Sequence, residues 1–185
     1  MTHIMAKIRF TEPTLIALTG HHFEACTENM KIKPYKLYLV EKGEVLSFKE
    51  TSTTSRVYLA IGGGFKLDSW LNSTSTDLNI GVGGFQGRTI QEGDEIEMKR
   101  DYTSRHRKLF ENLAHQRTTS WGIDGYALSF NYVSDVFHVI ANKGTNDFDT
   151  DTQQTFVHGE YKVTNKSNRV GTVSYTHLTL PTNRE

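Results

Sequence analysis

The chain is poor in cysteine and has no apolar run long enough to cross a membrane. Cys26 is the only cysteine among the 185 residues, which excludes an internal disulfide and any zinc site built on cysteines. The first ten residues, MTHIMAKIRF, lack the apolar core of a secretory signal peptide. From these absences we expect a cytoplasmic protein that does not bind a membrane.

An excess of charge of either sign is also missing. Lysine plus arginine and aspartate plus glutamate number 21 each, so the formal net charge is zero. Without a basic field the chain is not expected to bind nucleic acid. The sequence contains no P-loop, no G-x-S-x-G turn and no pairing of cysteine with histidine. It therefore predicts no nucleotide site and identifies no catalytic residue.

The best candidate for a metal site fails on its spacing. Asp147, Asp149 and Asp151 alternate like the opening of a calcium-binding loop. However, Thr152 stands where that loop requires glycine, and His158 stands where it requires a bidentate glutamate. We therefore predict a polar loop and no metal.

Short alternating runs, typical of β-strands, are what the sequence has in quantity. Val57, Leu59 and Ile61 alternate with Tyr58 and Ala60, which puts one set on a buried face. Similar runs occur at residues 15–19, 35–40, 45–49, 126–133, 136–142 and 161–164. A tight turn with glycine and acidic residues, 41–44, precedes the run at 45–49, and a similar turn at 91–95 predicts a further short strand at Ile96 and Met98. The pattern predicts an all-β fold, either a barrel or a sandwich.

Two stretches interrupt this pattern and predict one or two short helices. Residues 99–125 are basic, and the spacing of Leu109, Phe110 and Leu113 within them predicts one amphipathic helix. We interpret the surrounding charges as a solvated connector rather than an anion site. Residues 150–158 predict one or two further helical turns.

The most distinctive stretch is residues 56–88, RVYLAIGGGFKLDSWLNSTSTDLNIGVGGFQGR. A strand runs into three glycines, small hydroxyls follow, and a second glycine cluster ends at Arg88. Backbone N–H groups, hydroxyls and a guanidinium together suit a carboxylate, an amide or a phosphate. The glycines also fit a simpler interpretation, in which they only turn the corners of a barrel, and the pattern alone favours it.

Two motifs in this stretch carry a family resemblance. R-x-Y-L-A-x-x-G-G starts at Arg56, and S-T-D-L-x-x-G-x-G-G-x-x-G-R runs from Ser75 to Arg88. They resemble the family that includes the C-type subunit of bacterial 5-oxoprolinase, allophanate hydrolase subunit 2 and the carboxyltransferase part of urea carboxylase. LTG at residues 18–20, KGEVL at 42–46 and SNRVG at 167–171 agree with it. The resemblance implies a cyclophilin-like β-barrel, incomplete here because an earlier block of the family pattern has no match.

The resemblance and the chemistry of these motifs together give a set of candidate substrate-binding residues. Most lie in the glycine-rich stretch, and the rest form a polar triplet that could present an amide and a guanidinium together, or could simply be a capped turn. The candidates are Arg56, Tyr58, Ser75, Thr76, Asp77, Gly83, Gly84, Arg88, Ser167, Asn168 and Arg169.

The function that the resemblance implies is that of one subunit in an ATP-dependent 5-oxoprolinase, which converts 5-oxo-L-proline to L-glutamate. ATP would enter through partner subunits of a hetero-oligomer, and the chain alone is expected to be inactive. One alternative is biotin-dependent carboxyl transfer to urea or a similar amide. A second alternative is a non-enzymatic regulatory protein that binds a partner.

The last residues do not continue the family pattern. VSYTHLTLPTNRE, residues 173–185, resembles a translated sequencing adapter. We therefore expect residues 1–171 to be a fragment of a domain of the 5-oxoprolinase or carboxyltransferase type named above. Residues 172–185 are expected to be a foreign tail that makes no packed contacts.

Overall fold

The computed structural model describes residues 6–20, 23–49, 57–124, 139–141, 144, 148–164, 167 and 174–175. It divides the chain into two units, Met1–Val133 and Ser134–Glu185. Neither described helix is long and apolar enough to cross a membrane.

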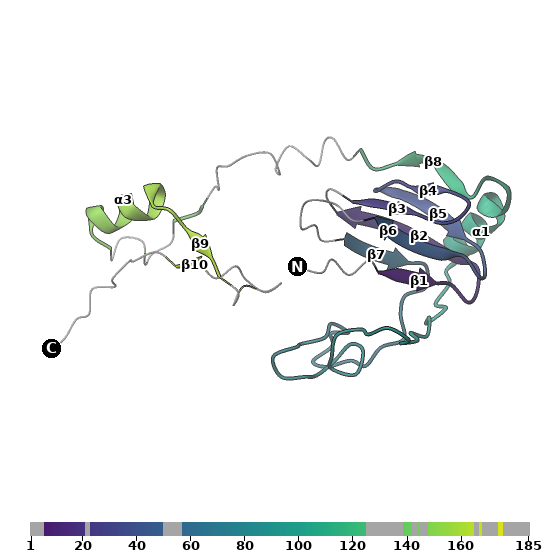
Figure 1. The fold of residues 1–185 in the computed structure, drawn as a ribbon, viewed down its shortest axis with the longest axis horizontal. Helices are drawn as coiled ribbons and strands as arrows, with labels where there is room; N and C mark the ends of the chain where they lie inside the picture. The colour runs from purple at the N-terminus through teal and green to yellow at the C-terminus, as the bar shows by residue number, and fades with distance from the viewer. Residues whose placement is uncertain are drawn as a thin grey trace. The chain divides into compact units, whose positions relative to one another are not determined.

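The first unit is built on two four-stranded antiparallel sheets (Figure 1). One sheet has the order β1 (Lys7–Arg9), β6 (Val45–Lys49), β3 (Glu24–Cys26) and β4 (Lys31–Ile32). The other has the order β7 (Val57–Ile61), β2 (Thr14–Gly20), β5 (Lys36–Val40) and β8 (Thr118–Gly122). The described strands do not close into a barrel. The predicted mainly-β fold with short helices is confirmed, and its barrel is incomplete.

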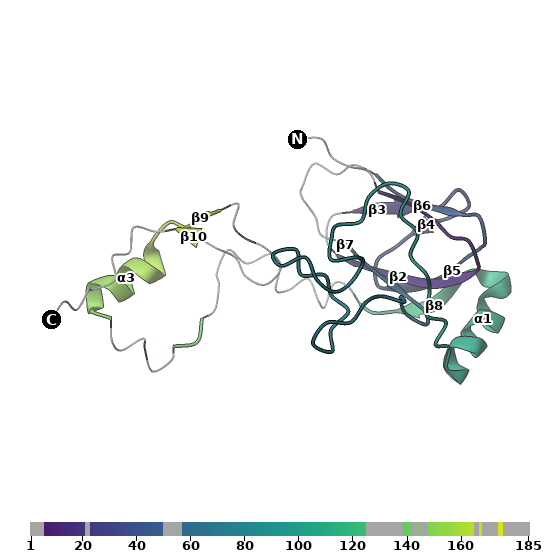
Figure 2. The same cartoon turned by 90° about the horizontal axis from the view of Figure 1, so that it is seen from below.

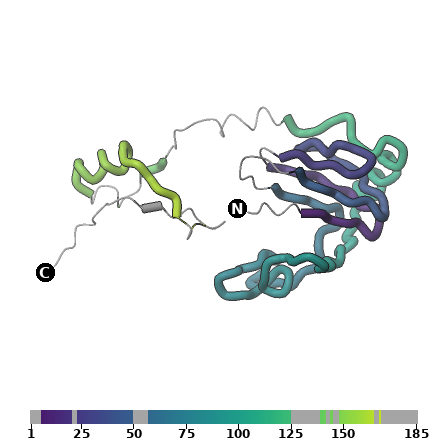
Figure 3. Tube along the Cα trace, viewed as in Figure 1, coloured from purple at the N-terminus to yellow at the C-terminus, as the bar shows by residue number. Residues whose placement is uncertain are grey.

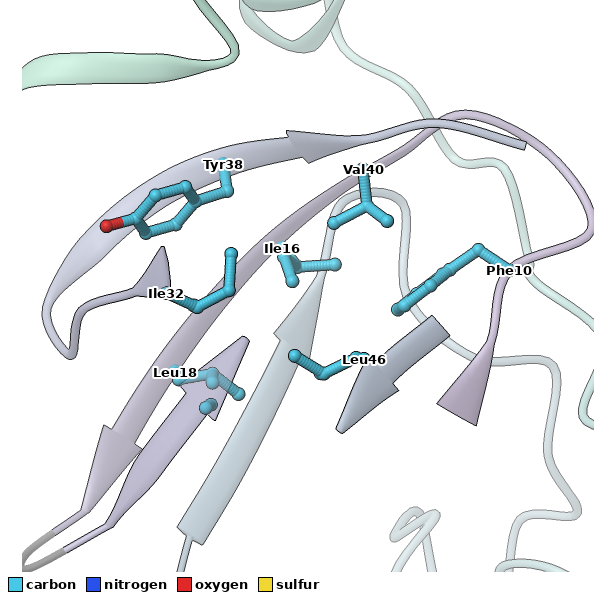
Figure 4. Packing of buried hydrophobic residues seen from close by; sticks show 8 residues of the cluster. Phe10, Ile16, Leu18, Ile32, Tyr38, Val40 and Leu46 are labelled. Atoms are coloured by element: carbon cyan, nitrogen blue, oxygen red, sulfur yellow. The ribbon is translucent and has the colours of Figure 1, made fainter. Parts of the chain in front are cut away.

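The hydrophobic core lies between the two sheets (Figure 4). Ile16 and Leu18 of β2 lie on the same buried face as Tyr38 and Val40 of β5, as the period of two requires. They pack against Leu46 of β6 from the opposite sheet. The Tyr38 hydroxyl accepts a hydrogen bond from the Lys33 N–H at 2.9 Å, so its polar atom is satisfied inside the core. The sheets therefore face each other as a sandwich.

Helix α1 (Ser104–Gln116) covers part of the other face of the second sheet, beside β5 and β8 (Figure 2). Its apolar residues Leu109, Phe110 and Leu113 pack against Leu15 and Leu39. The predicted amphipathic helix is thus confirmed. The connector predicted around it is only partly right, because strand β8 follows the helix at once.

Leu113→Ala tests how far this helix stabilises the sandwich. Leu113 is buried between α1 and the sheet, so the substitution should lower the free energy of unfolding by about 2 kcal/mol. Urea denaturation measures the loss. Asn112→Ala, at an exposed position of the same helix, is the control and should leave stability within about 0.5 kcal/mol. Equal losses in the two variants would show that α1 does not pack as described.

The second unit contains α3 (Thr150–His158), β9 (Lys162–Val163) and β10 (Ser174–Tyr175). The helical turns predicted at residues 150–158 are confirmed, and Asp149 caps the helix by accepting a hydrogen bond from the Thr152 N–H at 2.7 Å. β10 pairs antiparallel with β9, so the tail that we expected to make no packed contacts forms backbone contacts at residues 174–175. That residues 172–185 are foreign stays a prediction. The strand predicted at residues 126–133 and most of the one predicted at 136–142 lie outside the described residues.

Candidate functional site

Most of the candidate residues lie in the glycine-rich segment, residues 62–103, between β7 and α1 (Figure 3). Its two ends form a short ribbon in which the Lys66 N–H donates to the Glu97 carbonyl and the Lys99 N–H to the Gly64 carbonyl, each at 2.8 Å. The strand expected after the turn at residues 91–95 is reduced to this ribbon. The segment therefore leaves the sandwich and returns to it at one place.

A six-residue turn, Asp77–Val82, lies within the segment. The Asp77 N–H donates to the Val82 carbonyl at 2.9 Å, and the Val82 N–H donates back at 3.2 Å. The Asp77 carboxylate accepts a hydrogen bond from the Asn79 N–H at 2.9 Å. Asp77 thus shapes its own turn, as short polar side chains commonly do.

Gly83 and Gly84 allow a second strand of the segment to approach Ser75 and Thr76. A Cβ atom on Gly83 would lie 2.6 Å from the Ser75 carbonyl oxygen. A Cβ atom on Gly84 would collide with the Thr76 hydroxyl, and the φ angle of +57° at Gly84 is itself unfavourable for other residues. Beside this contact the Phe85 N–H donates to the Thr76 Oγ1 atom at 3.4 Å. These glycines therefore serve close packing within a loop rather than the corners of a barrel.

Arg88 forms a two-pronged ion pair with Asp94, at 2.7 and 2.8 Å between nitrogen and oxygen atoms. The same guanidinium donates to the Thr89 carbonyl and the Gln86 side chain, and it lies 5.1 Å from the centre of the Phe85 ring. An anionic ligand would have to share the Arg88 guanidinium with a carboxylate that already binds both of its terminal nitrogens. Whether Arg88 binds substrate stays a prediction.

Asp94 was not among the residues singled out from the sequence, although it anchors this part of the segment. Its carboxylate also accepts a hydrogen bond from the Gln91 N–H at 2.6 Å. The hydrogen bond from Arg88, followed by that from Gln91, lowers the pKa of Asp94 to about 2. The available signal was an acidic residue in a glycine turn six positions after an arginine, a pattern too common to identify a pair.

Asp94→Asn should loosen the segment around Arg88, because the neutral amide cannot accept both charged hydrogen bonds. We expect amide hydrogen exchange to accelerate by about tenfold across residues 85–91, the usual effect of losing one charge-assisted hydrogen bond. Glu97→Gln is the matched control, since it breaks an exposed ion pair with Lys66 at the base of the same segment. Its exchange rates should equal those of the wild type.

Acid should act on this segment only at very low pH. The pKa of Asp94 is lowered in the folded chain, so its stabilising effect is complete above its unfolded value near 4 and is lost as the pH falls through about 2. Exchange at residues 85–91, corrected for its intrinsic pH dependence, should therefore be constant between pH 5 and pH 8. A change within that window would show that another group controls the segment.

The structure brings only part of the candidate set together. Ser75, Thr76, Asp77, Gly83 and Gly84 form one cluster, and Arg88 lies in the same segment. Tyr58 lies instead on β7, paired in register with Thr19 of β2, and 62% of its side chain is exposed. Ser167 belongs to the second unit, where its N–H donates to the Thr164 carbonyl at 3.1 Å. The other candidates, Arg56, Asn168 and Arg169, lie outside the described residues.

The helix starts in the described part of the chain do not fit ATP. The first N–H groups of α1 face a reciprocal cap, in which the His106 ring nitrogen accepts from the Thr103 N–H at 3.0 Å. α3 begins at Asp149 and Asp151, whose negative charges would repel a phosphate. ATP cannot be assigned to these helix starts.

Comparison with known proteins identifies relatives of this chain. The model of the family "Carboxyltransferase domain, subdomain A and B" matches residues 1–175. The C-type subunit of the Haemophilus influenzae 5-oxoprolinase is 32% identical over 98 residues, which cover 53% of this chain and 32% of that protein. The urea amidolyase of Lachancea kluyveri is 38% identical over 91 residues, which cover 49% of this chain and 5% of that protein.

A solved structure is similar to this chain in fold. The crystal structure of the K. lactis urea amidolyase matches 92% of this chain and 10% of its own, with a TM-score of 0.60 and 22% identity. At that identity the likeness concerns the fold alone. The chain thus spans about a third or less of the length of each of these three relatives.

Proposed function

Because the chain belongs to the family of carboxyltransferase domains, subdomains A and B, we propose that it is part of an enzyme subunit that acts on a small amide within a complex. The family model matches residues 1–175, which include both described units up to β10. Whole relatives are much longer, so the activity proposed below is that of the complete assembly.

The reaction that we propose is the ATP-dependent opening of 5-oxo-L-proline to L-glutamate. The observation that carries this proposal is the 32% identity to a protein named as a subunit of 5-oxoprolinase. An unactivated lactam is a poor electrophile, so its opening has to be coupled to a source of energy. The sequence contains no P-loop, and in this proposal ATP binds on partner subunits. The complex would act in the cytoplasm.

The proposed role of this chain is to hold the substrate at the cluster of Ser75, Thr76 and Gly83. The Thr76 oxygen accepts the Phe85 N–H, which leaves the hydroxyl proton of Thr76 free to donate. Ser75, the adjacent residue, is exposed. Small donors at this spacing suit a lactam carbonyl or a carboxylate. Arg88 would orient the segment through Asp94 and could share its charge with the substrate, as Arg169 could from outside the described residues.

A second candidate function is biotin-dependent carboxyl transfer to urea or a similar amide. The 38% identity to a urea amidolyase supports it. The same hydroxyl and backbone donors would then stabilise negative charge that develops on an amide nitrogen. Biotin would be attached to a partner protein in this second reaction, whereas in the first reaction a partner subunit would bind ATP.

One assay separates the two reactions. The purified chain is combined with the other 5-oxoprolinase subunits of its source organism, and glutamate release is followed with and without ATP. In parallel, the chain is combined with a biotin carboxylase partner and urea, and carboxylation is followed. ATP-dependent glutamate release by the complex, with none from the chain alone, supports the first proposal. Urea carboxylation without glutamate release would replace it with the second.

A further inference from the structure

The glycine-rich segment, which carries the proposed substrate cluster, contains an unusual turn at Trp70–Ser73. The Trp70 N–H donates to the Ser73 carbonyl at 2.8 Å and the Ser73 N–H donates back at 2.9 Å, which closes a two-residue hairpin loop. Its central residues, Leu71 and Asn72, have φ angles of +47° and +62°. Such turns prefer asparagine or glycine, because a left-handed backbone is unfavourable for leucine.

Burial of the Leu71 side chain does not offset this backbone strain. Its side chain is 85% exposed to solvent. Trp70, beside it, is half-exposed although indole is the largest apolar side chain. A residue that is both strained and unburied is a reason to look for function outside the folded chain.

A second turn, Asp77–Val82, lies close to the first. It presents Leu78 and Ile80, which are also exposed. The two turns are held together, because Asp68 and Gly84 exchange backbone hydrogen bonds at 3.0 and 3.2 Å. A Cβ atom on Gly83 would lie 3.4 Å from the Trp70 Cβ atom. We call the two turns Trp70–Ser73 and Asp77–Val82 the loop tip.

The loop tip is almost uncharged. Between residues 69 and 87 the sequence contains one charged residue, Asp77, and its carboxylate is bonded to the Asn79 N–H. The remaining polar residues are serines, threonines, asparagines and a glutamine. An exposed tryptophan and the depletion of charged residues are features of the centre of a protein–protein interface.

We propose that the loop tip docks into an uncharged apolar groove on a partner subunit of the complex. The proposal rests on the proposed function, since it is the relative named as a subunit that implies non-identical partners. Docking would bury Trp70 and Leu71 and would bring the partner next to Ser75 and Thr76, at the proposed substrate cluster. A membrane is the less suitable occupant, because surface anchors of that kind need basic residues and none lies between residues 67 and 87.

Leu71→Asn gives this proposal a distinctive signature. Asparagine prefers the left-handed turn, so the melting temperature of the chain should stay the same or rise. Affinity for the purified partner subunits of the source organism, measured by titration calorimetry with the full chain, should fall about tenfold or more. Trp70→Ala should lower it at least as much. Trp121→Ala is the matched control, since Trp121 is also exposed but lies on β8. This variant should bind the partner subunits with the affinity of the wild type.

The outcomes distinguish docking from the reaction. If the wild type binds the partner subunits and Leu71→Asn and Trp70→Ala bind equally well, the docking proposal is overturned while the glutamate-release assay still decides the proposed function. If the wild type fails to bind them and instead sediments with anionic vesicles or self-associates, the docking proposal is overturned as well. Tip-dependent binding without glutamate release would support docking and contradict the reaction.

Discussion

Glu44→Gln is expected to lower the free energy of unfolding of the first unit by about 3 kcal/mol. Glu44 is 7% exposed and its carboxylate is fully engaged. One oxygen accepts from the Asn29 amide at 2.7 Å, and the other accepts from the Glu41 N–H at 2.7 Å and from the guanidinium of Arg117. A glutamine can replace neither the charge nor all of these acceptor positions, so Arg117 would lose its nearer counter-ion and keep only Glu41, at 4.0 Å.

Arg117 makes this ion pair more consequential than its position suggests. It ends α1 with a φ angle of +64°, and its N–H donates to the Leu113 carbonyl at 2.8 Å. Its side chain donates to the Leu39 carbonyl of β5 at 2.8 Å, while its own carbonyl accepts the Leu39 N–H. The pair with Glu44 therefore ties the end of α1 and the start of β8 to the turn between β5 and β6.

The same pair should make stability depend on acid. Burial alone would raise the pKa of Glu44, but the hydrogen bonds from Glu41 and Asn29 and the charge of Arg117 outweigh it and hold the pKa below its usual value. The stabilising effect is then complete at neutral pH and is lost as the pH falls through the lowered pKa. Urea denaturation between pH 3 and pH 7 should show this loss in the wild type and a smaller one in Glu44→Gln.

Glu24→Gln is the control for this prediction. Glu24 forms an exposed ion pair with Lys49 at 3.6 Å, with about half of its own side chain in solvent. Its replacement should change stability by no more than about 0.5 kcal/mol. Equal effects at positions 24 and 44 would mean that the buried carboxylate does not join the helix to the sheets.

Gly84→Ala should open the glycine-rich segment while leaving the sandwich folded. The added Cβ would collide with Thr76, and the left-handed φ angle adds a penalty of its own. Together these effects should destabilise the local fold of the segment by about 3 kcal/mol, as judged from amide exchange at residues 75–88. In the assembled complex we expect glutamate release to fall by about a hundredfold, because Ser75 and Thr76 would lose their positions.

Gly93→Ala is the control that separates the effect of a left-handed backbone from the effect of a steric clash. Gly93 has a φ angle of +88°, yet nothing lies within 4 Å of the position its Cβ would take. This variant should cost only the left-handed penalty of about 1 kcal/mol and should keep most of the activity. The close approach of Gly84 to Thr76 would be irrelevant to function if the two variants lost equal activity.

The sequence predicts those features that depend on local periodicity. Val57, Leu59 and Ile61 contact the core while Tyr58 is exposed, because a strand places alternate residues on opposite faces. The amphipathic spacing within residues 104–116 predicts α1 for the same reason. β8 escapes such reasoning, since only Thr119 is buried along it and no alternation marks it as a strand.

Contacts between distant residues could not be predicted in this way. Arg117 lies 73 positions from Glu44, and nothing in the spacing of charges along the chain indicates that they meet. The candidate site could be predicted in part from the sequence. The approach of Gly84 to Thr76 follows a glycine signal that the sequence displays, but the partner of Arg88 depends on the exact path of the turn that ends at Asp94.

The ribbon formed by Gly64–Lys66 and Glu97–Lys99 has a consequence for how this chain can change. The segment leaves the sandwich and returns to it through this one ribbon, so it behaves as a loop whose two ends are closed against each other. Doubling the length of a flexible loop adds only about 0.6 kcal/mol to the free-energy cost of closing it. Insertions and substitutions between residues 67 and 96 can therefore alter what the segment binds without endangering the core. The sandwich can therefore keep one fold while this segment changes in length and composition.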